Sequence, residues 1–143
     1  MLPYRHLQAS RRRAFVTTLV ALTALGGAGV AGCGQASPSQ QVRATLDRLG
    51  RATAAKDYHA LCTTVLAPML VQGVIKQGLP CERALALALN PVRSPQLTVR
   101  RITVNGSSAQ AAVHSTAANQ APFDGTVALT KVAGQWRVAS LVG

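Results

Sequence analysis

Four carboxylates and two histidines outside the N-terminal segment could take part in acid–base chemistry: Asp47, Asp57, Glu82, Asp124, His59 and His114. A proton-abstracting site needs a carboxylate base that faces a cavity, together with donors for the developing oxyanion. Each carboxylate has a structural explanation instead: Asp57 and Glu82 lie at predicted helix starts, Asp124 at a predicted turn, and Asp47 in a charged helix stripe. No serine elbow, phosphate-binding glycine loop or metal-ligand cluster accompanies them. The sequence therefore predicts a protein that is not an enzyme, with no catalytic residue, metal ion or cofactor.

The first 32 residues have the layout of an export signal. Arg5, Arg11, Arg12 and Arg13 precede an uncharged run from Ala14 to Ala31. A positive head followed by a short apolar stretch is typical of a secretory signal peptide. The alternative is an uncleaved membrane anchor, but the run is short against the roughly 20 residues that span a bilayer.

The run ends in Val30-Ala31-Gly32-Cys33, which resembles the bacterial lipobox, an aliphatic residue and two small ones before a cysteine. The resemblance implies cleavage after Gly32 and acylation of the Cys33 thiol. Cys33 would then be a lipidated N-terminus at the extracytoplasmic face of the cell membrane, followed by a polar tether over residues 33–39. An ordinary signal peptide, cleaved without lipidation, is the remaining alternative.

A second motif lies in the basic head. Arg12-Arg13-Ala14-Phe15-Val16 resembles the twin-arginine export motif, and its matching residues are Arg12, Arg13 and Phe15. That route would export a folded domain. The alternative is a merely basic head on the general secretory route, because three adjacent arginines contain an arginine pair automatically.

Cys62 and Cys81 remain as a pair of thiols once Cys33 is assigned to the lipid. On an exported domain such a pair predicts a disulfide, which over about 20 residues contributes roughly 3 kcal/mol. Metal ligation is the alternative, but two cysteines without a histidine cluster do not complete a tetrahedral site.

The positive charge does not predict nucleic-acid binding. The chain carries 15 basic and 4 acidic residues, a net charge of +11; four basic residues precede Cys33, which leaves 11 basic residues and +7. These eleven are scattered, with Arg100-Arg101 the one adjacent pair, and no nucleic-acid motif accompanies them. The residual charge favours proximity to anionic lipid head groups or wall polymers.

Residues 40–143 predict one α+β domain, beginning with helices. Ser37-Pro38-Ser39-Gln40 is typical of a helix start, and a helix over 38–55 follows. Asp57 caps a second helix through about Leu66. A third helix begins after Pro68 and stops near Gly78, and a fourth runs from Pro80 to Asn90-Pro91.

After Pro91 the apolar period changes from about 3.6 to 2, which predicts four antiparallel strands. Leu97 and Val99, then Ile102 and Val104, alternate but change phase across Arg100-Arg101, as a β-bulge would cause. Turns are predicted at Asn105-Gly106 and Ala133-Gly134. Helices followed by strands define the α+β class.

Several landmarks resemble small lipoproteins of the nuclear transport factor 2-like group, related to ketosteroid isomerases and polyketide cyclases. They are the Asp57–Cys62 segment, the Cys81 partner and the closing Gly134-Gln135-Trp136-Arg137-Val138 strand. The resemblance implies a cone-shaped roll, in which a curved four-stranded antiparallel sheet wraps the helices and leaves a pocket at the open end.

Three side chains are candidates for that pocket: Tyr58, His114 and Trp136. Core packing is the alternative for Tyr58 and Trp136. His114 lies opposite Val113 on its strand, so it is expected to point away from the core. It would line the pocket if the faces were reversed.

These features predict a lipid-anchored accessory domain that binds a small apolar ligand or a partner protein of the cell envelope. One alternative is an isomerase- or cyclase-like enzyme that uses the roll pocket. Another is a structural envelope component, pairing through its outer sheet face into homodimers. No nucleic-acid partner is predicted.

Overall fold

Ser37 caps the first helix of the structure, a computed structural model that describes residues 34–142. Its hydroxyl accepts a hydrogen bond from the Gln40 amide (3.3 Å), and the Ser37 amide donates to the Gln40 side chain (2.7 Å). Pro38 occupies the first helical position. This reciprocal cap satisfies amides that the helix cannot pair itself, so α1 (Pro38–Ala55) starts where the sequence predicts.

Four short helical segments follow α1. The predicted second helix is present in a modified form, because its hydrogen bonds widen to a five-residue spacing and the Leu66 amide donates to the Leu61 carbonyl (2.9 Å). Pro68 and Cys81 then open the two remaining helices. The segments are α2 (Tyr58–Ala60), the π-helix η1 (Leu61–Val65), α3 (Pro68–Ile75) and α4 (Cys81–Leu89).

The second half of the chain forms one antiparallel sheet in the order β1-β2-β3-β4. The register shifts between Val99 and Arg101, which confirms the predicted bulge. Gly106, Ala133 and Gly134 have positive φ angles at the two predicted turns. The strands are β1 (Gln96–Asn105), β2 (Ser108–Ala117), β3 (Gln120–Val132) and β4 (Gln135–Val142).

The core lies between α1 and the inner face of this sheet. The buried side chains of α1 recur every three or four residues, so they share one helix face, and the buried residues of β2 alternate along the strand. The larger buried side chains are Val42, Leu46, Leu49, Leu61, Val65, Leu66, Val113, Val127, Leu129, Trp136 and Val138. Residues 34–142 therefore contain a complete core of their own.

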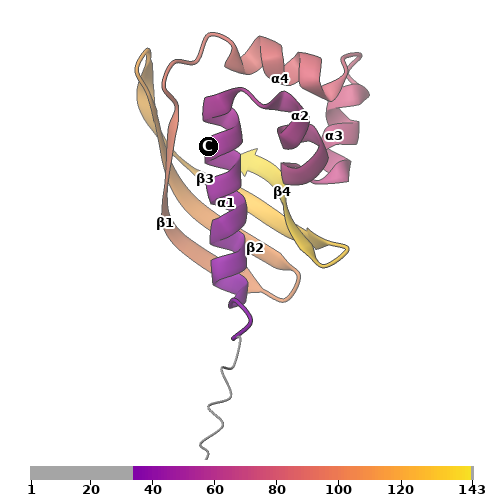
Figure 1. Cartoon of the computed structure of the whole chain (residues 1–143), viewed down its shortest axis with the longest axis vertical. Helices are drawn as coiled ribbons and strands as arrows, with labels where there is room; N and C mark the ends of the chain where they lie inside the picture. Colours follow the sequence, from indigo (N-terminus) through magenta and orange to yellow (C-terminus); the bar gives the residue numbers. More distant parts are fainter. Residues whose placement is uncertain (1–33, 143) are drawn as a thin grey trace, which may run out of the picture. The chain divides into compact units, whose positions relative to one another are not determined.

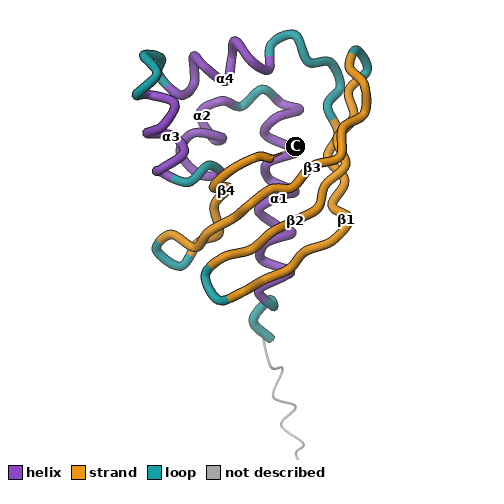
Figure 2. The backbone as a smooth tube through the Cα atoms, turned by 180° about the vertical axis from the view of Figure 1, so that it is seen from behind, coloured by secondary structure: helices purple, strands orange, loops and turns teal. Residues whose placement is uncertain are grey.

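The arrangement of the elements gives the domain two distinct ends (Figure 1). The start of α1 and the β1–β2 and β3–β4 turns lie at one end, and α2, α3 and α4 lie at the other. Seen from behind, the curved sheet lies in front of α1, and its strands cross the helix (Figure 2).

The segment after η1 covers the edge of β4, where the Ala67 amide donates to the Val138 carbonyl (2.7 Å). Within residues 34–142 no helix combines the length and apolarity needed to cross a membrane.

Candidate functional site

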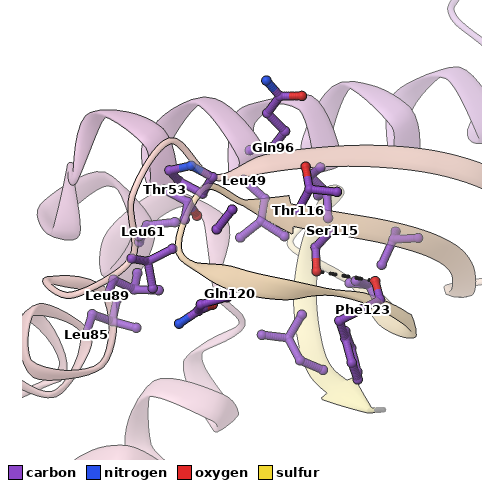
Figure 3. A pocket seen from close by; sticks show the side chains of 18 of the residues that line it. Leu49, Thr53, Leu61, Leu85, Leu89, Gln96, Ser115, Thr116, Gln120 and Phe123 are labelled. Atoms are coloured by element: carbon purple, nitrogen blue, oxygen red, sulfur yellow. Dashed lines mark hydrogen bonds between the residues drawn. The ribbon is translucent and has the colours of Figure 1, made fainter.

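A cavity of about 510 Å³ lies between the helices and the inner face of the sheet (Figure 3). This volume is within the range of small-molecule sites. The walls come from the second half of α1, from η1, α3 and α4, and from the strands. The lining residues are Leu49, Gly50, Thr53, Leu61, Leu66, Leu70, Val74, Leu85, Leu89, Val92, Pro95, Gln96, Leu97, Val113, Ser115, Thr116, Ala117, Gln120, Ala121, Phe123, Val127 and Leu141.

The cavity occupies the end of the domain away from the start of α1. Its lining includes the first residue of β1, Gln96, and the last residue of β2, Ala117. It also includes the first residue of β3, Gln120, and Leu141 near the end of β4. These strand ends lie at the same end of the domain as α2, α3 and α4 in Figure 1. Gln120, Phe123 and Leu141 are exposed, so the cavity opens beside the start of β3 and the end of β4.

Helical spacing explains why the helix walls are aliphatic. Leu85 and Leu89 are four residues apart on α4, and Leu70 and Val74 have the same spacing on α3, so each pair shares a face. All four side chains are half-buried, because they face the cavity. Leu87, between the first pair, does not line the cavity and is 58 % exposed.

The polar lining groups are uncharged. They are Thr53, Gln96, Ser115, Thr116 and Gln120, and no Asp, Glu, Lys, Arg or His of residues 34–142 belongs to the lining. The Ser115 hydroxyl donates to the Phe123 carbonyl (3.4 Å; Figure 3). Such a wall can exchange hydrogen bonds with a neutral group, but it has no ionised partner for a charge.

The four carboxylates of the described residues all lie outside this lining. Asp57 caps α2, accepting from the Ala60 amide at 2.9 Å. Glu82 is 2.9 Å from Nδ1 of His59, and both side chains are largely exposed. Asp47 is exposed on α1. None of the carboxylates of residues 34–142 therefore belongs to the cavity lining.

Asp124 corrects one detail of the sequence prediction. It was expected at a turn, but it lies within β3, directly opposite His114 in the β2–β3 register. Its Oδ1 is 2.9 Å from the His114 ring and 3.5 Å from Nε of Arg100. Because the neighbouring Val113 is buried, this cluster lies on the outer face of the sheet.

Tyr58, His114 and Trp136, the predicted pocket residues, do not line this cavity. His114 points outward, as its alternation with Val113 indicates. Trp136 is buried in the core at 3 % exposure, and Lys131 lies 5.4 Å from the centre of its ring. Tyr58 packs half-buried against the core. Trp136 and Tyr58 therefore pack in or against the core, and His114 points outward, as the alternative interpretations predicted.

The helix walls of the cavity were missed from the sequence as site residues. Leu70, Val74, Leu85 and Leu89 look like ordinary core residues, because an apolar face packed on a sheet and one that faces a cavity have the same periodicity. A usable signal is the alternation Leu85-x-Leu87-x-Leu89. Three leucines at that spacing cannot share one helix face, so Leu87 had to lie on the opposite face from Leu85 and Leu89.

The predicted disulfide is present. Cys62 and Cys81 are joined with their Cα atoms 6.1 Å apart, which connects η1 to α4. The export residues Arg12, Arg13 and Phe15 and the lipobox residue Cys33 lie outside the described residues. Within the described part of the chain, no group of three or more metal-ligating side chains occurs.

No protein-family model matches the chain, and no curated protein is significantly similar to it in sequence. Among solved structures, it is similar to an NTF2-like protein of unknown function from Shewanella baltica OS155, with 17 % identity and a TM-score of 0.49, over 74 % of this chain and 94 % of that one. A de novo designed protein with a curved β-sheet matches with 18 % identity and a TM-score of 0.36, over 44 % of this chain and 61 % of that one.

The chain's own topology defines its class. Residues 34–142 form an α+β domain in which four α-helices and one π-helix precede a curved four-stranded antiparallel sheet in simple sequential order. Neither structural similarity indicates a ligand or an activity for this chain.

Proposed function

We propose that this protein is an exported, lipid-anchored member of the nuclear transport factor 2-like group that binds a small apolar molecule without transforming it. The cavity carries the proposal. A volume of about 510 Å³ lined by aliphatic side chains excludes water from a ligand of that size, and burial of apolar surface stabilises the complex by about 25 cal/mol per Å².

The composition of the lining supports the non-catalytic role. An isomerase- or cyclase-like reaction needs an ionisable group within reach of the substrate. The cavity lining holds none, and each described carboxylate lies elsewhere. Binding is the activity that the remaining chemistry supports.

Export and anchoring rest on residues 1–33. The arginine-rich head, the uncharged run and the Val30–Cys33 lipobox support a lipid on Cys33. The Cys62–Cys81 disulfide agrees with this placement, because disulfides persist outside the reducing cytoplasm. Whether the twin-arginine or the general route is used does not alter the proposal.

The anchor and the cavity would then lie at opposite ends of the domain. Four residues, Gly34–Ser37, separate Cys33 from α1, and an extended chain of that length reaches only about 14 Å. The start of α1 would stay near the membrane, at the opposite end of the domain from α2, α3 and α4 (Figure 1). The lining residues at the ends of the strands place the cavity at that far end. The ligand would therefore be exchanged on the side that faces away from the anchoring membrane.

A fluorescent titration tests the binding function. Residues 34–143 contain every described element, and N-phenyl-1-naphthylamine is an uncharged apolar probe whose emission rises on burial. We expect saturable binding that Leu85→Lys weakens at least about tenfold, because it places a charge in the apolar wall.

The matched control is Leu87→Lys, on the same helix but outside the lining and exposed. It should bind the probe like the unaltered protein. Circular dichroism should show both variants folded. Absence of saturable binding to the unaltered protein, or equal effects of the two substitutions, would contradict the proposed site.

A further inference from the structure

Thr53 differs from the other threonines of the helical segments. The hydroxyls of Thr45, Thr63 and Thr64 each donate to the carbonyl four residues earlier, at 3.2, 2.8 and 2.8 Å. Thr53 lines the cavity, and within residues 34–142 its hydroxyl makes no such bond and has no other protein partner. It therefore remains available to a ligand.

Thr53 lies on the face of α1 that packs against the start of β1. Gly50, one turn earlier on α1, packs so closely on β1 that a Cβ at Gly50 would be 3.5 Å from the Leu97 Cβ. Gln96 and Thr116, which pair in the β1–β2 register, alternate with Leu97 and Ser115, so their side chains share the outer face of the sheet with His114. We name the Thr53 hydroxyl the polar corner of the cavity (Figure 3).

The polar corner contrasts with the walls around it. The helix walls are leucine and valine, and Val113, Phe123, Val127 and Leu141 extend the apolar surface across the sheet. A ligand that fills this space needs an apolar body. Its polar end can exchange a hydrogen bond with the Thr53 hydroxyl, but a charged end would lose hydration without meeting an opposite charge.

We propose that the cavity selects amphiphiles whose single polar end is uncharged, such as a hydroxyl or carbonyl group, and that the polar corner binds this end. The inference rests on the proposed binding function and specifies its ligand class. It excludes carboxylates, phosphates and ammonium groups as the end group. Free fatty acids would be poor ligands, and long-chain alcohols or neutral acylglycerols would be good ones.

Displacement of N-phenyl-1-naphthylamine compares three ligands with the same ten-carbon chain. At pH 8, 1-decanol is neutral, decanoate is negative and decylammonium is positive, so their apolar contributions match and only the end group differs. We expect 1-decanol to bind at least about tenfold more tightly than either ion.

A pH series tests whether the negative charge of decanoate weakens its binding. The carboxyl group of decanoic acid titrates near that of glutamate, at about 4.3. As the pH falls towards 4 the acid becomes neutral, so its affinity should rise towards that of 1-decanol. The affinity of 1-decanol is the internal control, because the alcohol does not titrate in this range and its binding should change only if the protein unfolds.

Thr53→Val tests the polar corner, because valine keeps the shape and removes the hydroxyl. It should weaken 1-decanol about two- to tenfold, the usual range for one hydrogen bond, and leave N-phenyl-1-naphthylamine binding unchanged. Thr63→Val, outside the lining, is the matched control and should change neither. Equal loss of both ligands in Thr53→Val would indicate altered packing and overturn the assignment.

Decanoate bound as tightly as 1-decanol at pH 8 would overturn the selectivity. It would direct attention to Arg93, which lies in the chain between the lining residues Val92 and Pro95. Failure of the uncharged probe to bind at all would instead contradict the proposed function itself. The two failures are therefore distinguishable.

Discussion

The disulfide between Cys62 and Cys81 joins two walls of the cavity. Leu61 precedes the first cysteine and lines the cavity from η1, and Leu85 lines it from α4, one turn after the second cysteine. The bridge thus holds a π-helix and a short α-helix together. Neither segment is long enough to be stable as an isolated helix.

Replacement of both cysteines by serine should lower the free energy of unfolding by about 3 kcal/mol, because the open chain regains the entropy of a loop of about 20 residues. Urea denaturation measures this change. A reductant should lower the stability of the unaltered protein to the same level and leave the double variant unaffected. A stability that does not respond to the reductant would contradict a structural bridge.

Gly50→Ala should stabilise the protein by up to about 1 kcal/mol, since glycine is a poor residue in a helix interior and the added Cβ meets Leu97 at an ordinary contact distance of 3.5 Å. Thermal denaturation measures the change. Gly50→Phe should instead place a large ring in the cavity. It should reduce binding of N-phenyl-1-naphthylamine sharply, and unchanged binding to Gly50→Phe would contradict the position of the cavity.

Ser37→Ala should destabilise the domain by about 1 kcal/mol, because it leaves the Gln40 amide without its side-chain acceptor. Ser39→Ala, within the first turn of α1, is the control and should change the stability much less. Chemical denaturation of both variants checks the difference. Equal effects would show that the cap does not stabilise α1.

Cys33→Ser should abolish lipid attachment, because a hydroxyl does not replace the thiol as the acylated group. Intact-mass measurement of the membrane fraction should find the unaltered protein without residues 1–32 and with an added acyl mass. The Cys33→Ser variant should lack the acyl mass and leave the membrane fraction. An unprocessed, unmodified Cys33 in the unaltered protein would contradict the anchor.

Local signals predicted the fold well. The cap at Ser37, the bulge near Arg100 and the turns at Asn105-Gly106 and Ala133-Gly134 each depend on neighbours a few residues apart, and the structure confirms them. The π-helical spacing at Leu61–Val65 was not predicted, because nothing in its composition separates it from an α-helix.

The site was predicted less well, because it depends on contacts between distant segments. The register of β2 against β3 places Asp124 beside His114 on the outer face, and the sequence around Asp124 resembles a turn. Thr53 lines the cavity only after α1 has packed on β1. Aromatic and titratable residues drew attention to Tyr58, His114 and Trp136, whereas the cavity is aliphatic.

Methyl NMR of residues 34–143 during titration with 1-decanol tests the central claim most directly. If the cavity is the binding site, the methyl resonances of Leu85, Leu89 and Val113 should shift saturably, while those of the exposed Leu87 should not. Shifts confined to Leu87 and other exposed methyl groups, or no saturable shift at all, would contradict a ligand-binding cavity.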